Sequence, residues 1–560
     1  MPRSFSLRPM VDSATNSPTP RPRAAGWLAL GLVLVAVLLV LSLATAQFQT
    51  LLNSDYLLAH VFAHALGDTA HPISGWNFGS ATFWFPDYIL YLPLDWLCDN
   101  SGLSYPLYAV VIILLIGFTM AWSLAAVGIA WTKAIIATFF GLDLVLLSQG
   151  LPGHSAWLWQ LTVPAYHGGN VVNGFALLAL GLGAARKGRW DKIHSVAVVA
   201  LIFLAGASNS LFFVHWLAPL VLALIWTGWR EKSLRPVALG LVRRAALALM
   251  LVIALRMFLV KAQIFSFYEV MRFAPSPALI WSCFIRFLRI FGRYGLFADN
   301  WLLWLLGTGG LLAAVNGLRP AREPDAVKRV ALLAELLSLL FALSAPIVTN
   351  YWADFHSIRY IINWLVVPVW IIALRVCSHP SPSHWLPRLA AIGAIAGAVF
   401  AVPQIDSTKL VFPRPTSAQT LRDFCARHNY HEGLSGYWNA HLLTVEWNFD
   451  GPRLDQIDNN FFAYFWCNNT FDFFPPGENG PGFSRPAPQF IILNGLDVVH
   501  VMTFLKTNNL RITQVGPYVV AVLTPEQTKN AGDKITQQVL AMLQGTRAEW
   551  LQTQLPPATE

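Results

Sequence analysis

The stretch from Gln47 to Tyr105 reads QFQTLLNSDYLLAHVFAHALGDTAHPISGWNFGSATFWFPDYILYLPLDWLCDNSGLSY. It follows the first long apolar segment and contains no Lys or Arg but five acids: Asp55, Asp68, Asp87, Asp95 and Asp99. Long loops inside compact proteins are usually functional. We therefore expect a long polar loop that forms half of an active site on the non-cytoplasmic face. Asp55, where the first helix leaves the bilayer, is the candidate general base. The alternative is a re-entrant or amphipathic cover whose acids contact water.

The composition predicts a polytopic α-helical membrane protein. Of 560 residues, 55% are hydrophobic and only 12% are charged, about half the charged fraction of soluble domains. Several apolar runs reach the length of about 17–25 residues that spans a bilayer. The net charge of +9 resides mostly at helix ends, and no cluster of basic and aromatic residues indicates nucleic-acid binding.

The apolar runs predict about eleven transmembrane helices within residues 26–404. Residues 1–25, rich in Pro and Ser, are expected to form a disordered cytoplasmic tail, followed by an uncleaved first span. The expected spans are Trp27–Ala46, Pro106–Ala130, Ala134–Ser148, Gly169–Ala185, His194–Gly206, Leu211–Gly228, Ala245–Val260, Asn300–Gly317, Val330–Val348, Ile358–Val376 and Leu386–Gln404.

Lys and Arg distribution predicts the orientation, because cytoplasmic helix ends are rich in both. With the N-terminus inside, the expected cytoplasmic ends carry Lys133, Arg186, Lys187, Arg189, Lys192, Arg230, Lys232, Arg235, Arg243, Arg244, Arg319, Arg322, Lys328, Arg329, Arg375 and Arg388. The segments 47–105 and 149–168 have none. An odd number of spans then places the C-terminal region outside.

The segment 261–299 departs from this charge rule. Arg286, Arg289 and Arg293 recur at helical spacing and share one face, with Phe side chains between them. This pattern predicts an amphipathic helix in the outer interface. Its arginines would either contact lipid phosphates or, together with Lys261, form a basic wall for a phosphate-bearing lipid substrate.

Two further external segments carry candidate binding residues. Near the start of a late apolar helix, Asp354, His356 and Arg359 are ionisable groups at membrane depth, which tend to be functional or paired. Arg359 would pair with Asp354 or donate two hydrogen bonds to a substrate phosphate. In 152–170, His154 and His167 flank Trp157 and Trp159, which would serve as interface residues or stack on sugar rings.

Residues 405–560 predict a separate extracytoplasmic α/β domain, because the region is polar and has no spanning run. We expect helices at Ser417–His428 and Lys534–Gln554, and strands at Leu442–Trp447, Phe490–Leu493 and Tyr518–Leu523. Cys425 and Cys467 both lie in this domain and are candidates for a disulfide in an oxidising compartment. The sequence has no zinc-type Cys/His spacing and no Walker loop.

The chain resembles the C-type (GT-C) superfamily of polytopic membrane glycosyltransferases, in particular uncharacterised bacterial members. The resemblance rests on the architecture and on short motifs: Asn53-Ser54-Asp55-Tyr56, Phe85-Pro86-Asp87-Tyr88, His356-Ser357-Ile358-Arg359-Tyr360 and Gly436-Tyr437-Trp438-Asn439-Ala440. Tyr56 stands where the family usually has a second acid. The resemblance implies a GT-C-like transmembrane domain in a bacterial inner membrane and transfer of a sugar from a polyprenyl-phosphate donor to a glycan, lipid or protein acceptor.

The chemistry implied by the resemblance assigns roles to the candidate residues. Asp55 would accept the proton of the attacking acceptor hydroxyl, giving inversion, and Asp87 would orient the acceptor or hold the loop. Arg359, helped by the arginine face or Lys261, would stabilise the leaving phosphate. We expect the remaining substrate contacts from Trp84, His154, His167, His356 and Tyr360, and no cofactor, although a divalent metal is not excluded.

Two non-enzymatic alternatives remain open at the sequence level. One is a transporter, flippase or assembly factor for lipid-linked glycans, for which matched internal repeats would be the cue. The other is a structural membrane protein whose outer domain recruits partners. The expected partners are the lipid-linked sugar donor, membrane lipid and the acceptor.

Overall fold

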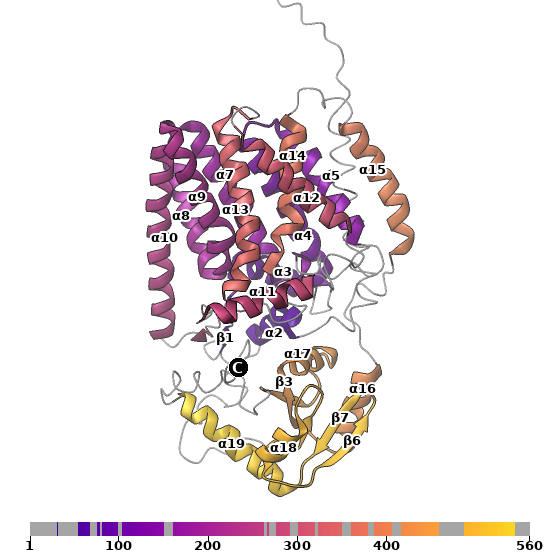
Figure 1. The fold of residues 1–560 in the computed structure, drawn as a ribbon. Helices are drawn as coiled ribbons and strands as arrows, with labels where there is room; N and C mark the ends of the chain where they lie inside the picture. The colour runs from indigo at the N-terminus through magenta and orange to yellow at the C-terminus, as the bar shows by residue number, and fades with distance from the viewer. Residues whose placement is uncertain are drawn as a thin grey trace, which may run out of the picture.

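The computed structural model describes residues 31, 54–67, 76–78, 81–98, 103–149, 161–261, 266–267, 276–291, 301–319, 323–349, 360–378, 386–405, 416–458 and 487–543. These residues form a mostly helical bundle and, at one end of it, a small domain built on a β-sheet (Figure 1). The bundle helices are α4 (Ser104–Ala126), α5 (Trp131–Gln149), α7 (Gly168–Lys187), α8 (Lys192–Ser208), α9 (Ala218–Arg230), α10 (Arg235–Lys261), α12 (Trp301–Gly317), α13 (Ala326–Val348), α14 (Asn363–Ser378) and α15 (Leu386–Ala401).

Four described helices are long and apolar enough to cross a membrane: Ser104–Ala126, Gly168–Lys187, Lys232–Leu259 and Ala326–Val348. Five shorter apolar helices accompany them, at Leu57–Gly67, Lys192–Ser208, Leu305–Gly317, Asn363–Ser378 and Arg388–Val399. The membrane character predicted from composition is therefore confirmed, with fewer helices of full spanning length than the eleven predicted. Of the expected first span, Trp27–Ala46, the structure describes only Gly31.

Within the first long segment, the expected loop is instead largely helical. The described part holds α2 (Ser54–Gly67), a π-helical turn η2 (Trp84–Tyr88) and α3 (Ile89–Leu97). Three of its polar side chains are buried, since His60, Asp87 and Asp95 are each 2% exposed or less. The prediction of a loop was wrong because these polar residues were assigned to solvent. In the structure His60 and Asp95 lie within hydrogen-bond distance of each other, and Asp95 and Asp87 accept hydrogen bonds from Ser104 and Tyr108 of α4.

Helix α11 (Pro277–Phe291) runs across the end of the bundle, over the bundle side of the C-terminal domain (Figure 1). Cys283 and Phe287, one turn apart, are buried, and the Cys283 thiol lies 3.7 Å from the Pro346 carbonyl oxygen of α13. Trp281, Leu288 and Arg289 are exposed on the other side. The predicted amphipathic helix is thus present.

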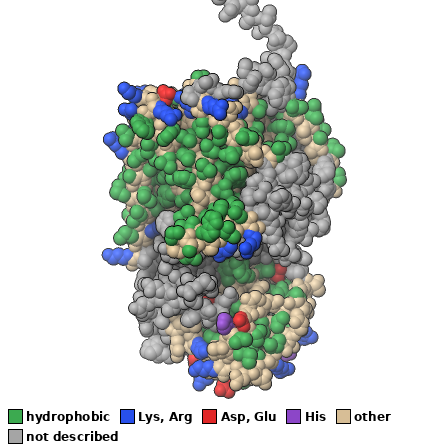
Figure 2. Space-filling model, in the orientation of Figure 1, with side chains coloured by type: hydrophobic (Ala, Val, Ile, Leu, Met, Phe, Trp, Pro, Cys, Tyr) green, Lys and Arg blue, Asp and Glu red, His purple; other side chains and the backbone are tan. Residues whose placement is uncertain are grey.

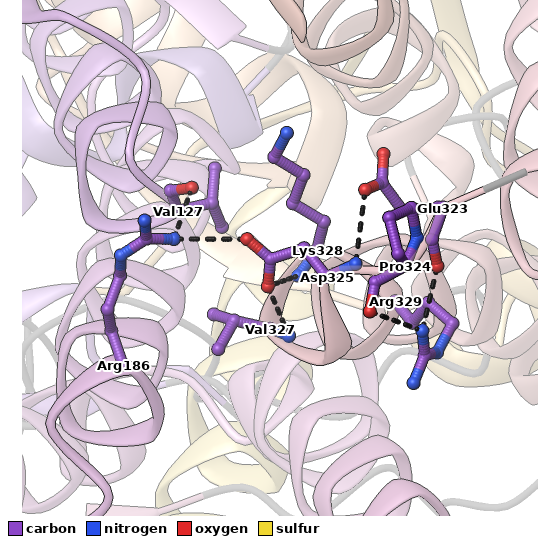
Figure 3. Close-up of polar contacts among 8 residues, drawn as sticks. All are labelled: Val127, Arg186, Glu323, Pro324, Asp325, Val327, Lys328 and Arg329. Carbon is purple, nitrogen blue, oxygen red and sulfur yellow. Dashed lines mark hydrogen bonds and ion pairs between the residues drawn. The ribbon is translucent and has the colours of Figure 1, made fainter. Parts of the chain in front are cut away.

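Asp325, Arg186 and Arg329 form a group of polar contacts between bundle helices (Figure 3). Asp325 begins α13 by accepting hydrogen bonds from the Val327 and Lys328 amides, a favourable N-cap. Its second oxygen accepts from Arg186 Nη1 at 3.1 Å, and the same nitrogen donates to the Val127 carbonyl at 2.9 Å. One Asp side chain therefore joins the α13 start to α7 and to the α4–α5 turn.

A second arginine belongs to the same group of contacts. Arg329 donates to the carbonyls of Glu323 at 2.7 Å and Pro324 at 2.9 Å, and its other terminal nitrogen pairs with Glu231 at 2.6 Å. On the surface, Lys and Arg gather at the bundle end away from the C-terminal domain, and a hydrophobic belt lies between that end and the domain (Figure 2).

The C-terminal domain contains a five-stranded sheet in the order β4-β3-β5-β7-β6. Strands β4 (Arg453–Ile457), β3 (Glu432–Gly436) and β5 (Phe490–Ile492) are parallel, whereas β7 (Tyr518–Val522) and β6 (Arg511–Val515) are antiparallel. The helices are α16 (Thr416–Arg427), α17 (Tyr437–Glu446), α18 (Val498–Leu505) and α19 (Pro525–Leu543). The predicted helix near 417–428 and the strands near 490 and 518 are confirmed, while the closing helix begins nine residues before the predicted Lys534.

The strand predicted at Leu442–Trp447 is wrong, since most of this stretch belongs to α17. Leu443 and Trp447 are buried in the domain's own core, whereas Leu442 and Val445 pack against the bundle core. Because α17 is covered on two sides, its apolar residues form a nearly continuous run, and short buried helices and strands share that pattern.

The domain docks on the bundle through α17 and the turn that follows it. The Phe449 ring stacks on His64 of α2, with ring centroids 3.7 Å apart and planes 10° apart. Phe449 also approaches the buried His60 ring at 5.6 Å. Its backbone has φ of 57°, an uncommon left-handed conformation for a residue other than glycine.

Candidate functional site

The segment 81–88 is held against the ends of two bundle helices. The amides of Thr82 and Phe83 donate to the Ser208 carbonyl at 2.8 and 3.1 Å, and the Phe85 amide donates to Ser208 Oγ at 3.0 Å. From α7, Asn173 Nδ2 donates to the Phe85 carbonyl at 3.3 Å. Ser208 ends α8, between the predicted spans His194–Gly206 and Leu211–Gly228, and its backbone and side chain anchor residues 82–85.

This anchoring places Asp87 at the start of α7. Tyr108 of α4 donates its hydroxyl to Asp87 Oδ1 at 2.5 Å, and the Gly169 and Ala165 backbones also bond to the carboxyl. A Cβ on Gly169 would lie 2.0 Å from Asp87 Oδ2, so the acid and the helix can approach only because residue 169 is glycine. The carboxyl therefore joins the segment 81–88, α4 and α7.

Asp87 is an acid with a raised pKa outside the spanning helices. Burial raises the pKa of its carboxyl to about 6, against the opposing effect of the hydrogen bonds from Tyr108 and the backbone. Amides at a helix N-terminus favour the ionised form, which keeps the pKa from rising further. Asp87 can therefore exchange a proton near neutral pH. Because its carboxyl is buried and bonded to Tyr108 and the α7 start, we assign it the role of holding the segment 81–88 in place.

A second buried acid follows two helical turns later on the same face. Asp95 Oδ1 accepts hydrogen bonds from Ser104 at 2.7 Å and Tyr91 at 2.9 Å, and lies 3.0 Å from His60 Nδ1. Burial alone would raise the pKa of Asp95, but the hydrogen bonds and charge of His60, with those of Ser104 and Tyr91, hold it below its ordinary value. Asp95 is thus an ionised structural acid that ties α2, α3 and α4 together.

Two more predicted residues lie beside the α7 start. His167 is two residues before Gly169, is 5% exposed, and meets the Tyr360 ring edge-on with centroids 6.2 Å apart. Tyr360 is 8% exposed, in the turn just before α14. Asp87, His167 and Tyr360, from three distant parts of the sequence, therefore meet at one end of the bundle.

Other predicted residues lie elsewhere. Lys261 ends α10 with an exposed side chain, and Arg289 is exposed on α11. No contact between either residue and Asp87 occurs in the part of the chain that the structure describes. Trp84 packs in an aromatic cluster with Phe62 at 5.7 Å and Phe78 at 5.3 Å, a position that stabilises the first segment.

Several predicted residues lie outside the described residues. Asp55 occupies the second position of α2, but its side chain is not among those described. His154, Arg293, His356, Arg359 and Cys467 also lie outside. Cys425 is a free, buried thiol in the structure, so the predicted disulfide with Cys467 is not formed there.

The sequence alone assigned no partners to His60, Asp95 or Ser208. A usable signal was the spacing of Asp87, Tyr91 and Asp95, four residues apart, which places all three on one helical face. Within the described residues, no group of three or more His, Cys, Asp or Glu side chains could hold a metal ion.

Comparison with known proteins assigns no family. No protein-family model matches the chain, and no curated protein sequence matches it.

Proposed function

We propose that the protein is a membrane glycosyltransferase of GT-C type that moves a sugar from a polyprenyl-phosphate donor to a glycan, lipid or protein acceptor. In this proposal the chain crosses a bacterial inner membrane about eleven times, and the C-terminal domain is extracytoplasmic. The gathering of Lys and Arg at the bundle end away from that domain supports this orientation.

The observation that carries the proposal is the convergence of Asp87, His167 and Tyr360 at the bundle end that faces the C-terminal domain. Helix α11, with Arg286 and Arg289, crosses the same end (Figure 1). Acidic, aromatic and basic groups thus share the region where a membrane-embedded lipid phosphate would meet an acceptor arriving from water.

Charge development in the reaction assigns the remaining roles. When the anomeric carbon–oxygen bond breaks, negative charge grows on the leaving lipid phosphate and positive charge on the sugar. Arg359, one residue before Tyr360, stabilises that phosphate with two parallel hydrogen bonds. Asp55 accepts the proton of the acceptor hydroxyl as its oxygen attacks from the opposite side.

Asp87 holds the segment that follows α2 in place rather than reacting. Its carboxyl bonds to Tyr108 and the α7 start, which fixes η2 and α3. Such a positioning residue acts on the geometry of the site, where a displacement of about 1 Å can cost about 100-fold in rate.

The test is incubation of the purified protein with radiolabelled polyprenyl-phosphate sugars. We expect label transfer or donor hydrolysis in the wild type and its loss in Asp55→Asn, with the folded yield unchanged. Asp423→Asn, at an exposed position of α16, is the matched control and retains turnover. Donor binding without turnover by the wild type would contradict the proposal and favour a transporter or flippase, and near-normal turnover by Asp55→Asn would remove Asp55 from the base role.

A further inference from the structure

Glu335 is a carboxyl in the middle of the spanning helix α13. Its side chain is 1% exposed, and neither oxygen has a hydrogen-bond partner among the described residues. An isolated carboxylate in an apolar interior costs several kcal/mol at least, so the group is neutral unless a partner compensates its charge. Ionisable residues at this depth mark proton or substrate paths more often than packing.

Two polar side chains, Ser338 and Asn363, lie between Glu335 and the bundle end that carries Tyr360, and within the described residues they bond to each other and not to Glu335. Ser338 lies one turn further along α13 on the same face, and its Oγ accepts from Asn363 Nδ2 of α14 at 2.7 Å. Asn363 is fully buried, and its Oδ1 has no partner within the described part of the chain. Tyr360, which meets His167, precedes Asn363 by three residues.

The charged groups on the neighbouring helices lie away from Glu335. Helices α7, α9, α11, α12 and α14 pack against α13, as does the turn η3 (Phe213–Leu217). Among their described residues, the titratable groups are Arg186, Lys187, Arg230, Arg375 and Cys377 toward the inner helix ends, Cys283, Arg286 and Arg289 on α11, and His215 in η3; α12 has none.

The helix registers place His215 well away from Glu335 along the bundle. Arg329 pairs with Glu231 where α9 ends. His215 precedes Glu231 along its helix, and Glu335 follows Arg329 along α13, so both lie on the same side of this ion pair. At a rise of about 1.5 Å per residue, His215 lies about 15 Å further along the bundle axis than Glu335. None of these groups is positioned to neutralise Glu335.

Asp143 of α5 provides an internal comparison. It is 1% exposed and has no partner in the described residues. Gly141 faces Val369, since a Cβ on Gly141 would lie 2.4 Å from Val369 Cγ1. Helices α5 and α14 are antiparallel, so Asp143 is level with about residue 367 of α14. Because Ser338 of α13 bonds to Asn363 of α14, Glu335 lies at about the same depth. The residues one helical turn from Asp143 are Phe139, Phe140, Leu146 and Leu147, so no hydroxyl stands to Asp143 as Ser338 stands to Glu335.

We propose that Glu335 is a proton-binding site inside the bundle, and that Ser338 and Asn363 connect it to the end that carries Tyr360 and His167. The proton resides on a carboxyl oxygen of Glu335 at neutral pH. It exchanges by a concerted swap, in which the acid O–H passes to Ser338 Oγ while the Ser338 hydroxyl returns its own hydrogen to the other carboxyl oxygen, and Asn363 holds the Ser338 oxygen through its Nδ2–H bond. This proposal does not depend on the glycosyltransferase proposal.

Infrared spectroscopy of the full-length protein in lipid nanodiscs at neutral pH tests the proton. The wild type minus Glu335→Gln difference spectrum is expected to show the carbonyl stretch of a protonated acid, shifting in heavy water. Glu335→Asp is expected to move this band and so covers a failure of the Gln variant to fold. A difference confined to the carboxylate stretches would overturn the proposal. Glu526→Gln, at an exposed position of α19, is expected to change only carboxylate stretches.

The rate at which the band shifts after transfer to heavy water tests the connection. Removing one relay hydrogen bond adds about 1.4 kcal/mol to the barrier, so Ser338→Ala should slow exchange at Glu335 about tenfold. The Asp143 band, assigned with Asp143→Asn, should keep its rate. Unchanged exchange at Glu335 in Ser338→Ala, or equal slowing at both acids, would refute the connection.

Discussion

Replacing Asp87 by Asn should remove a pH-dependent part of the protein's stability. Burial raises the pKa of Asp87 to about 6 from 3.8, so the folded state keeps its proton to higher pH than the unfolded state does. Stability is therefore complete below about pH 4 and is lost as the pH rises through about 6. At 1.36 kcal/mol for each pKa unit, the loss is about 3 kcal/mol.

The Asn side chain keeps the size of Asp and cannot ionise. Its amide faces the backbone donors of the α7 start, and this mismatch costs about 1–3 kcal/mol at every pH. The free energy of unfolding of Asp87→Asn relative to the wild type should therefore rise by about 3 kcal/mol from about pH 4 to about pH 7.

The assay is unfolding of both proteins in detergent across this pH range, and all other titrating groups cancel in the comparison. Tyr108→Phe removes a hydrogen bond that lowers the Asp87 pKa, so its transition should move to higher pH. Parallel stability profiles for the wild type and Asp87→Asn would refute the reasoning, because they would mean that Asp87 titrates equally in the folded and unfolded states.

Changes at three other positions, Asp325, Phe449 and Cys425, test the packing. Asp325→Ala should lower stability by about 1 kcal/mol through loss of the α13 cap. Asp325→Asn keeps the cap and loses only an exposed ion pair worth about 0–1 kcal/mol. Equal shifts of the melting temperature for the two variants would count against the cap. Phe449→Ala should speed amide exchange in α17 about fivefold, the equivalent of about 1 kcal/mol of ring stacking, and unchanged exchange would argue against docking through His64. Burial raises the pKa of the Cys425 thiol to about 12, so maleimide should modify it only after unfolding, and rapid labelling of the native protein would contradict its burial.

Much of the helical framework could be predicted from apolar runs, because each run must fill a helix whose whole circumference is buried or faces lipid. Helix α10 illustrates the limit. Its basic start, with Arg235, Arg243 and Arg244, was excluded from the predicted span Ala245–Val260, yet the helix continues through it from Arg235. Arg244 is accommodated because it donates to Ser195 Oγ and lies over the Trp190 ring.

The candidate site was harder to predict because its contacts join distant parts of the chain. Asp87 is one of five acids in a stretch without Lys or Arg, but nothing in its local sequence identifies Gly169 or Tyr108 as partners. Ser208 lies between two predicted spans, and its role in holding residues 82–85 depends on how α8 ends in space. Position along the sequence indicated which groups are unusual, whereas three-dimensional packing decides which of them meet.

The claim on which the proposed chemistry depends is that Asp55 and Arg359 face one lipid-phosphate pocket. In a variant lacking the five native cysteines, Asp55→Cys and Arg359→Cys can be joined by a short thiol-specific cross-linker in the membrane. The account predicts efficient intramolecular cross-linking that a polyprenyl phosphate suppresses, and none when Asp55→Cys is combined with Arg186→Cys at the opposite end. Absence of the 55–359 cross-link, with both thiols reactive toward a small maleimide, would contradict it.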